Sequence, residues 1–360
     1  MLELSEPLRI GFIGVGSVVT HFYMPALFEL KSHVQALGPV QVVAAADVNE
    51  AHLARMRDDF NVPHVYRDYH QMLEKHPDLH AVIICTPNEL HVAPTVAAMA
   101  HGMHVLVEKP MARTVDECEQ MLSAARASGK ELVVGFQWRW HAESRFIRRQ
   151  VEEGLLGEII YVRVQTLRRR GIPNWGNFVQ KQKTGGGPLI DMGVHLCELA
   201  LFLMGSHHSE PAAVSGSTWT YLGNRPDETE NLWPNWNHKL YDVEDLAVGH
   251  VRFANGASMV VEASFAAHVR EPVNDVQIFG TRGGATWSRG EVYTDLNGYM
   301  MNIAPGFLRK TDVWHEKLRH FVEVCRGMRQ NQSSGEEGLA VQKILNGIYA
   351  AAEAGREVRL

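Results

Sequence analysis

The strongest constraint on the fold of this chain is a short apolar run that ends in two charged residues and a proline. Residues 105–107 are Val-Leu-Val, without the alternation of a half-buried strand, which predicts a β-strand buried on both faces. Pro110 cannot donate to a sheet, so Glu108 and Lys109 lie at the carboxyl end of that strand. Ligands of open α/β sheets bind at this edge, which makes Lys109 a candidate for acid–base or electrostatic catalysis. Taken alone, such a sequence is more often a surface ion pair.

Further apolar strands surround this one, and helical segments separate them. We predict strands at 8–13, 40–46, 81–85 and 132–134, with helices at about 90–101 and 115–127. The alternation of strand and helix predicts a parallel sheet with right-handed crossovers. The carboxyl ends of the strands then share one edge, where a glycine turn, an acid and a lysine collect. That combination is more specific than any of its parts.

The first strand runs into Gly14-Val15-Gly16, as in the phosphate-binding turn of dinucleotide-binding units. Gly14 allows the tight turn and Gly16 lets the backbone approach a pyrophosphate, whereas the third glycine position is Val19, which predicts slightly looser packing of helix on strand. Asp47 ends the second strand, where an acid accepts hydrogen bonds from ribose hydroxyls and repels a 2′-phosphate. Asp47 therefore favours NAD over NADP, although it could instead cap the helix that follows.

The bulk properties are those of a globular protein with two domains. The chain has 360 residues, of which 45% are hydrophobic and 21% charged. A net charge of −6 argues against a general nucleic-acid-binding surface. The four cysteines have no close pair, as expected in a reducing compartment, and the first residues lack the positive charge of a signal peptide. We find no apolar run long enough to span a bilayer and expect a soluble, cytoplasmic protein with no membrane partner.

A different pattern begins after about residue 135. Residues 158–166, 246–253 and 259–265 alternate between apolar and polar side chains, which predicts half-buried strands, and Asn255-Gly256 predicts a hairpin. We predict further strands at 214–221 and 276–279, and helices at about 142–153 and 338–354. Runs of adjacent strands indicate a mainly antiparallel sheet that helices cover on one face. We therefore predict an α/β Rossmann domain over residues 1–135, followed by an α+β domain with a large, mainly antiparallel open sheet over residues 136–360.

The second domain holds another group of candidate catalytic residues. The run Gly185-Gly186-Gly187-Pro188 predicts a turn into a helix, on which Asp191 and His195 are four residues apart and share one face. A carboxylate beside an imidazole can set its tautomer and raise its basicity. The alternative is a surface pair worth about a few tenths of a kcal/mol. Lys109 at a cofactor edge favours the catalytic interpretation.

These motifs follow one another in a familiar order along nearly the whole chain. They are residues 11–16 with His21, Met24-Pro25-Ala26-Leu27, Thr86-Pro87-Asn88-Glu89-Leu90-His91, Glu108-Lys109-Pro110 and residues 185–195. In them the chain resembles the glucose–fructose oxidoreductase, inositol dehydrogenase and rhizopine-catabolism family (Gfo/Idh/MocA), from which Val19 departs because the family usually has Ala or Gly there. The resemblance implies a Rossmann domain, an α/β domain with a large open sheet, and nicotinamide-dependent chemistry on sugars, cyclitols and their relatives. Residues 171–176 resemble a segment found in a subgroup of the family that acts on sugars and glycosides.

The strand ends and the resemblance together give the candidate site residues. We expect NAD to contact Gly14, Gly16, Ser17, Val18, Asp47, Thr86, Pro87, Asn88, His91, Glu108, Lys109 and Gln137. The candidate catalytic residues are Lys109, Asp191 and His195, and the expected substrate contacts are these three with Trp138, Arg139 and Trp175. Tryptophan faces suit the C–H faces of sugar rings, although tryptophan more often fills a core. The run Arg168-Arg169-Arg170 is more often a solvated strand end than a site for an acidic sugar, and His207-His208 has no third ligand, so no metal site is predicted.

We expect an NAD(H)-dependent oxidoreductase that transfers a hydride between the nicotinamide and a secondary alcohol of a sugar, glycoside or cyclitol. His195 would take the hydroxyl proton, Asp191 would orient His195, and Lys109 would stabilise the developing oxyanion. Two alternatives stay open: an enzyme that retains and recycles its NAD, and a non-catalytic regulator that senses sugar or NAD. The partly apolar sheet predicts a homodimer or homotetramer. The expected ligand is a small carbohydrate or polyol, with no nucleic-acid partner.

Overall fold

A computed structural model describes residues 3–30, 34–205, 210–226, 228–230 and 233–360 of the chain. Its contacts divide the chain into two compact units. The first unit consists of Met1–Gln137 with Thr311–Leu339, and the second of Trp138–Lys310 with Ala340–Leu360. The predicted division after residue 135 assigned every later residue to one domain, so the return of residues 311–339 to the first unit differs from that prediction.

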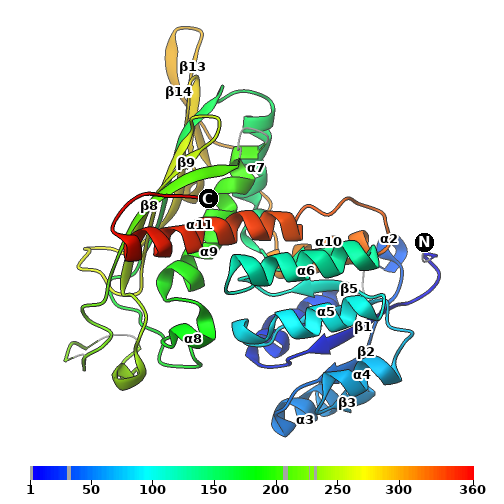
Figure 1. The fold of residues 1–360 in the computed structure, drawn as a ribbon. Helices are drawn as coiled ribbons and strands as arrows, with labels where there is room; N and C mark the ends of the chain where they lie inside the picture. Colours follow the sequence, from blue (N-terminus) through cyan, green and yellow to red (C-terminus); the bar gives the residue numbers. More distant parts are fainter. Residues whose placement is uncertain (1–2, 31–33, 206–209, 227, 231–232) are drawn as a thin grey trace. The chain divides into compact units, whose positions relative to one another are not determined.

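A six-stranded parallel sheet forms the centre of the first unit, in the order β3-β2-β1-β4-β5-β6 (Figure 1). Its strands are β1 Leu8–Ile13, β2 Val40–Ala46, β3 His64–Tyr66, β4 Ala81–Ile84, β5 His104–Val107 and β6 Leu132–Val134. The direction of winding reverses between β1 and β4, as in doubly wound dinucleotide-binding sheets. The predicted parallel sheet is confirmed. Only β3 was not predicted, because three residues of mixed polarity carry no periodic signal.

The helices of the first unit connect these strands and include one segment from far along the chain. They are η1 Val19–Tyr23 (a π-helix), α1 Met24–Leu30, α2 Val34–Leu37, α3 Glu50–Asp58, α4 Tyr69–Lys75, η3 Asn88–Leu90, α5 Val92–Ala100, α6 Val115–Ser128 and α10 Val313–Cys325. α5 and α6 lie side by side (Figure 1). α10 packs against α1. Val19 begins η1 fully buried in the same core as Phe12 and Tyr23, so the larger side chain is accommodated at the third fingerprint position.

α10 was not predicted, although its sequence explains it. Asp312 caps the helix by accepting hydrogen bonds from the backbone of Trp314 and His315. Leu318, Phe321 and Val322 follow at helical spacing and are fully buried in the core beneath the Rossmann sheet. The helix is therefore an integral part of the first unit.

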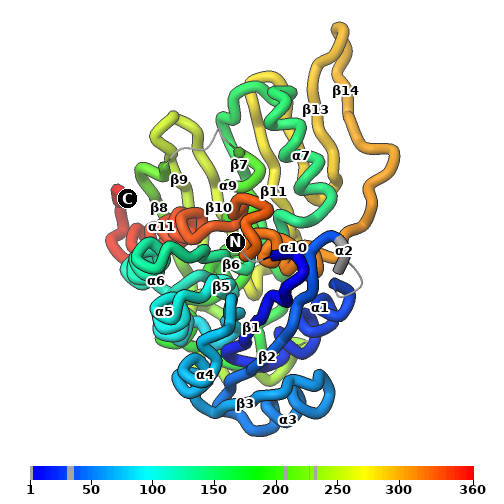
Figure 2. Tube along the Cα trace, turned by 90° about the vertical axis from the view of Figure 1, so that its right-hand side faces the viewer, coloured from blue at the N-terminus to red at the C-terminus, as the bar shows by residue number. Residues whose placement is uncertain are grey.

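A nine-stranded sheet forms the second unit, in the order β14-β13-β12-β11-β7-β10-β9-β8-β15. Its strands are β7 Ile159–Leu167, β8 Pro211–Trp219, β9 Leu246–Phe253, β10 Ser258–Ser264, β11 Val273–Gly280, β12 Gly283–Thr286, β13 Glu291–Leu296, β14 Tyr299–Ile303 and β15 Val358–Arg359. β7 pairs in parallel with β10, and the other described pairs are antiparallel. The prediction of a mainly antiparallel sheet is confirmed. The hairpin of β13 and β14 extends past the other strands (Figures 1 and 2).

Helices of the second unit pack against this sheet. They are η4 Trp138–Trp140, α7 Ala142–Glu152, α8 Lys181–Thr184, η5 Leu189–Gly193 (a π-helix), α9 Val194–Met204, η7 His238–Leu240, η8 Trp287–Arg289 and α11 Gly335–Ala354, which begins in the first unit. α9 contacts β7 and β11 and is apolar on nearly all sides, as expected of a helix in the core. Residues Lys181–Met204 are long and apolar enough to cross a membrane by length and composition, which corrects the expectation that no such run exists. Because 83% of the apolar 18-residue part of this stretch is buried inside the protein, we interpret the stretch as a core helix.

Candidate functional site

The glycine turn after β1 has the space that a bound phosphate needs. Gly14 has a φ of +78°, and a Cβ there would lie 2.7 Å from the backbone nitrogen of Thr86, so only glycine fits. A Cβ on Gly16 would meet nothing closer than the His52 ring at 3.8 Å. Packing inside the protein therefore does not require glycine at position 16, whereas close approach of a pyrophosphate does. Ser17 and Val18 are exposed beside it.

Asp47 holds the glycine turn and does not cap the next helix. Its carboxylate accepts hydrogen bonds from the backbone of Val15 at 2.8 Å and of Asn49 at 2.8 Å. His52 lies 3.2 Å from the same carboxylate. The side chain that caps α3 belongs to Asn49, which accepts from Ala51, so the capping alternative for Asp47 is wrong. An acid thus stands at the end of β2, beside the turn.

The segment after β4 is tied to the loop that follows β5. Thr86 and Asn88 are half-buried and Pro87 is exposed at the strand end. His91 is 1% exposed, and its ring nitrogens lie 2.9 Å from the carbonyl oxygens of Thr86 and Pro110. Burial lowers the pKa of His91. The ring of His91 thus links the two loops that carry the other candidates, and its contact with NAD stays a prediction.

Lys109 lies where the sequence predicted, directly after β5. The Lys109–Pro110 peptide bond is cis, and the Lys109 backbone N–H donates to Glu108 Oε2 at 3.1 Å. Glu108 is buried, and its other carboxylate oxygen accepts from Tyr23 and Lys317. Burial raises the pKa of Glu108, but the charge and hydrogen bond of Lys317 and the hydrogen bond of Tyr23 outweigh it, so the pKa lies below its ordinary value. The backbone of Lys109 is held by an ionised carboxylate.

Gln137 supplies a further polar group at this edge of the first unit. It follows β6, and its side-chain oxygen is buried without a hydrogen-bond partner among the residues that the structure describes. Buried acceptors of this kind are rare because each costs free energy, about 1–3 kcal/mol. The open glycine turn, Asp47 and this amide together fit a dinucleotide that runs along the carboxyl edge of the sheet.

In the second unit, a buried acid holds the turn that leads to Asp191 and His195. Glu244 accepts hydrogen bonds from the backbone of Gly187 at 3.0 Å and of Leu189 at 3.1 Å, and from the Tyr349 hydroxyl at 2.7 Å. A Cβ on Gly187 would lie 2.6 Å from the Glu244 carbonyl oxygen, so the glycine permits this contact. Burial raises the pKa of Glu244.

Asp191 and His195 lie on consecutive helices of different type. Asp191 is in the π-helix η5 and His195 in the first turn of α9, and both are half-buried. The sequence predicted one α-helical face for the pair, so the π-turn is a departure from that prediction; such turns are frequent at functional sites. Asp191 also opposes the burial that lowers the pKa of Arg168, so these two charges interact. The orientation of His195 by Asp191 stays a prediction.

An aromatic stack flanks His195. The Trp138 indole is stacked on the His195 ring at 5.3 Å and 15°, and on the Trp287 indole at 5.3 Å and 16°. Trp287 donates to Ser144 at 2.8 Å, and Ser144 donates to the Trp138 carbonyl at 2.8 Å. Trp138 thus restrains the His195 imidazole, in addition to any contact with a sugar.

Arg139 does not face a substrate. It is 1% exposed, and its guanidinium donates to the Glu198 carboxylate at 2.7 Å and stacks over the Phe202 ring at 5.0 Å. The expected substrate contact of Arg139 is therefore corrected: the residue joins η4, which carries Trp138, to α9, which carries His195. By contrast Trp175 is 49% exposed, with its edge against Trp233 at 4.9 Å, and it remains available to a ligand.

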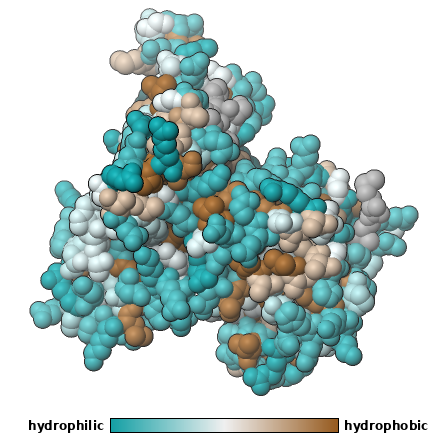
Figure 3. All heavy atoms as spheres, viewed as in Figure 1, coloured by the Kyte–Doolittle hydropathy of each residue, from teal (hydrophilic) through white to brown (hydrophobic). Residues whose placement is uncertain are grey.

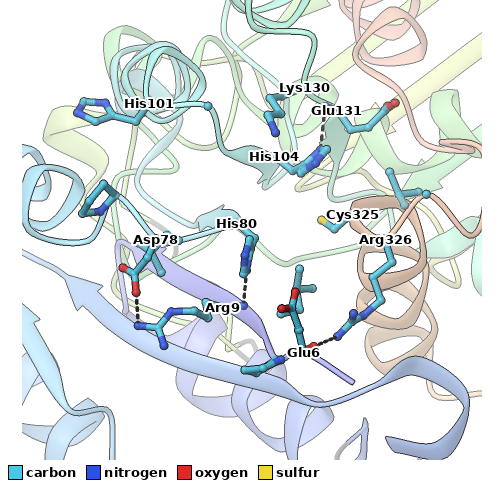
Figure 4. Close-up of a pocket in the computed structure, with 17 residues that line it drawn as sticks. Glu6, Arg9, Asp78, His80, His101, His104, Lys130, Glu131, Cys325 and Arg326 are labelled. Atoms are coloured by element: carbon cyan, nitrogen blue, oxygen red, sulfur yellow. Dashed lines mark hydrogen bonds and ion pairs between the residues drawn. The ribbon is translucent and has the colours of Figure 1, made fainter. Parts of the chain in front are cut away.

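A cavity of about 880 Å³ lies at the opposite edge of the Rossmann sheet, where the strands begin (Figure 4). His80 and His104 line it, and each accepts a backbone hydrogen bond at Nδ1, from Arg9 and Glu131 respectively. Arg9 is paired with Asp78 at 2.6 Å, and Arg326 donates to the carbonyl oxygens of Glu3, Glu6 and Pro39. Both arginines of this cavity are thus engaged within the protein, and the cavity lies at the other end of the strands from the glycine turn.

Sequence reasoning missed the residues that anchor the site. Lys317 and Tyr23 bind Glu108, and Trp287 stacks on Trp138. Glu244, which Tyr349 binds, holds the turn before Asp191. None of these five residues belongs to a motif. Within the described residues no group of three or more His, Cys, Asp or Glu is placed to hold a metal ion, and His207-His208 lies outside the described residues. The four cysteines are free thiols.

Comparison with known proteins matches both parts of the chain. A family model described as "Oxidoreductase family, NAD-binding Rossmann fold" matches residues 8–136, and the "GFO/IDH/MocA C-terminal domain" matches residues 144–286. D-glucoside 3-dehydrogenase of Escherichia coli (strain K12) is 30% identical over 99% of this chain and 98% of its own length. Levoglucosan dehydrogenase of Pseudarthrobacter phenanthrenivorans is 31% identical over 77% of this chain and 71% of its own.

Solved structures share the fold over the full length. An NAD-binding oxidoreductase from Klebsiella pneumoniae has a TM-score of 0.83 and 25% identity, covering 98% of this chain and 99% of its own. Levoglucosan dehydrogenase in complex with NADH and levoglucosan has a TM-score of 0.81 and 24% identity, covering 98% of this chain and 99% of its own.

Proposed function

Because the chain belongs to the GFO/IDH/MocA family of oxidoreductases, we propose that Lys109, Asp191 and His195 are its catalytic residues. The protein is an NAD(H)-dependent enzyme that transfers a hydride between the nicotinamide and a secondary alcohol of a sugar, glycoside or cyclitol. Within that class a glycoside or simple sugar is the best-supported substrate, since a relative that is 30% identical over 99% of this chain is named for glucoside, and one that is 31% identical over 77% is named for levoglucosan.

The observation that carries this proposal is the way in which the candidate groups are held. Glu108 binds the backbone of Lys109, and Glu244 binds the backbone of the turn before Asp191. Catalytic groups need such fixed positions, because a shift of about 1 Å can cost about 100-fold in rate. If the candidate side chains had no function, buried acids would not be needed to fix the backbone next to them.

Each residue then has a defined task. NAD, when bound, supplies the hydride acceptor. His195 takes the proton from the substrate hydroxyl, and Asp191 keeps the imidazole in the tautomer that can accept it. The Lys109 ammonium donates a hydrogen bond to the same oxygen as negative charge develops on it. The stacked Trp138 limits rotation of the His195 ring and stabilises the cation that forms, by about 0.5–1 kcal/mol or more.

The cofactor side of the proposal rests on the carboxyl edge of the first unit. The open backbone at Gly14 and Gly16 takes the pyrophosphate, with Ser17 and Val18 beside it, and Asp47 takes the ribose hydroxyls. Thr86, Pro87, Asn88, Glu108 and Gln137 complete the set. We further propose a cytoplasmic location, which suits the free cysteines, and a homodimer or homotetramer.

In the experiment, a panel of glycosides, sugars and cyclitols is incubated with NAD. The formation of NADH is followed for each compound over the pH range from 6 to 10. We expect at least one glycoside or sugar to be oxidised, and His195→Ala to lose about 100- to 10,000-fold in kcat with its thermal melting temperature retained. Turnover of a sugar pair without added NAD would instead identify an enzyme that recycles a retained cofactor. A His195→Ala variant as active as the wild type would overturn the catalytic assignment.

A further inference from the structure

Lys317 is a buried cation that belongs to no motif and lies next to the catalytic loop. Its side chain, on α10, is 1% exposed, and its ammonium donates to Glu108 Oε1 at 2.6 Å. The Gly135 carbonyl oxygen lies 3.4 Å away. The ammonium also sits over two aromatic rings, 3.9 Å from the centre of Trp314 and 4.5 Å from that of Tyr23. Two π faces and a carboxylate replace the water that this cation lost on folding.

Glu108 connects this cation to Lys109. Oε1 accepts from Lys317 and from the Tyr23 hydroxyl at 2.5 Å, while Oε2 accepts from the Lys109 backbone at 3.1 Å. The carboxylate is closely surrounded, because a Cβ on Gly135 would lie 3.0 Å from Oε1. It has no room to turn away and find other partners. The charge and position of the Glu108 carboxylate therefore also fix the backbone at the start of the loop that carries the Lys109 side chain.

Stability alone does not account for such a pair. Buried ion pairs often contribute no more than apolar residues of similar volume, because desolvation offsets the attraction. Removing one partner, however, leaves a buried charge that must be neutralised or exposed. The pair is thus a poor way to stabilise the sheet but an effective way to hold a carboxylate ionised at a chosen place.

We propose that Lys317 is a positioning residue for catalysis, which keeps Glu108 ionised and, through it, holds the backbone of Lys109 in the reactive position. The inference rests on the proposed catalytic function of Lys109. The charged or titratable groups around Glu108 are Lys317 on α10, Tyr23 on η1, Cys85 and His91 after β4, and Lys109 itself. Burial lowers the pKa of His91, which opposes a charge on its ring. Cys85 and Tyr23 are neutral at physiological pH, since burial raises the pKa of both. Lys317 is the principal cation that offsets the burial of Glu108, and Lys109 adds a smaller charge effect.

The test compares Lys317→Met with the wild type across pH. Without the ammonium, burial raises the pKa of Glu108 toward neutrality, so kcat should acquire a new acid limb as Glu108 takes up a proton. At pH 7 we expect kcat to fall about 10- to 100-fold, as for a catalytic group displaced by a fraction of an ångström to 1 Å, while KM for the sugar changes less than threefold. In Glu108→Gln/Lys317→Met the acid limb should disappear, because the titrating group is gone. A purely structural lysine would lower the melting temperature and leave the pH profile unchanged.

Arg326→Met is the matched control. Arg326 follows α10, is 4% exposed and donates to three backbone carbonyls at the far edge of the sheet, so its loss removes a buried cation without touching Glu108. It should lower the melting temperature and keep the wild-type kcat and pH profile. Should Lys317→Met fail to fold, Tyr23→Phe removes one hydrogen bond to the same carboxylate and should produce a weaker acid limb.

Failure of this inference is distinguishable from failure of the catalytic proposal. If Lys109→Ala is inactive while Lys317→Met and Tyr23→Phe both fold with the wild-type kcat and pH profile, Lys317 is structural and only the inference is overturned. If Lys109→Ala itself is fully active, the proposed function of Lys109 fails first.

Discussion

At the scale of single residues, the candidate site depends on side chains that do not meet the substrate. Glu108 and Glu244 are both buried, and each carboxylate accepts at least one backbone N–H hydrogen bond from a segment that carries a proposed catalytic residue. Charge-assisted hydrogen bonds of this kind are about twice as strong as neutral ones, and their geometry is narrow. The backbone of Lys109 and the turn before Asp191 are thereby held by residues to which we assign no chemical step.

Replacing Lys109 tests the electrostatic part of the mechanism. A donor aimed at developing negative charge typically supplies about 3–4 kcal/mol, so Lys109→Ala should lose about 100- to 1,000-fold in kcat. Binding of NAD, measured by titration of intrinsic fluorescence, should persist, because Gly14, Gly16 and Asp47 are untouched. Lys109→Arg should not restore activity, since the guanidinium is larger and does not give up its proton. Near-wild-type kcat in a folded Lys109→Ala protein would contradict the assignment.

Replacing Asp47 tests whether one negative charge determines the preference for NAD over NADP. Asp47→Asn keeps an oxygen that can accept from the Val15 backbone but removes the charge that repels a 2′-phosphate. We expect the ratio of kcat/KM for NAD to that for NADP to fall about 10- to 100-fold, since a like-charge contact costs several kcal/mol at most. Asp78→Asn, which loses a carboxylate paired with Arg9 elsewhere on the unit, is the control and should leave the ratio unchanged. A wild-type enzyme that prefers NADP would refute this use of Asp47.

At the scale of elements, the strands of the first unit were predictable because each is a short apolar run between breakers. The glycine turn, Asp47 and Lys109 could then be placed at the ends of β1, β2 and β5 from the local sequence pattern alone. α10 was missed because its pattern is amphipathic but lies far from any motif. The bond between Lys317 and Glu108 spans 209 residues, and no local pattern reports that a charged side chain will be buried. Long-range burial of polar groups is thus the part of the site that required the structure.

The start of β5 gives a pH-dependent prediction. Burial is the main cause that lowers the pKa of His104 to about 4, from its ordinary value near 6.5. The unfolded chain therefore binds a proton first as the pH falls, and the free energy of unfolding decreases between about pH 6.5 and pH 4. The full shift corresponds to about 3 kcal/mol, but the ring is only partly buried, so we expect about 1–2 kcal/mol.

Urea unfolding at pH 7 and pH 4.5 measures this loss. His104→Asn should reduce the difference in unfolding free energy between the two pH values by about 1 kcal/mol or more, because asparagine does not titrate there. The exposed His101, which lines the same cavity, serves as the control, and His101→Asn should leave the difference unchanged. Equal pH dependence in wild type and His104→Asn would rule out this linkage.

At the scale of the whole molecule, one face of the second sheet is only partly covered. Tyr161 and Phe279 form a ring pair at 5.2 Å on that face, and Val260 and Val248 are half-buried further along it. The view in Figure 3 is mostly hydrophilic, with hydrophobic residues in separate small groups. A sheet face that carries incompletely buried aromatic and aliphatic side chains is a candidate subunit interface.

We therefore expect the protein to associate through this face. Light scattering at micromolar concentration should give twice or four times the chain mass of 40.4 kDa. Val260→Glu places a charge in the middle of the face and should shift the mass toward the monomer, whereas Met328→Glu, an exposed site on the first unit, should not. A wild-type protein that scatters only as a monomer would contradict the prediction.

The return of α10 to the first unit has a consequence for how the protein is made. The ribosome releases the six strands of the first unit within the first 137 residues, but the helix that supplies Lys317 emerges only near the end of synthesis. Until then the Glu108 carboxylate lacks its cation, and the apolar positions that Leu318 and Phe321 later fill are open to water. We therefore expect a fragment that ends at residue 137 to lack part of the core of the first unit. The ion pair between Lys317 and Glu108 can form only after the entire second sheet has been translated.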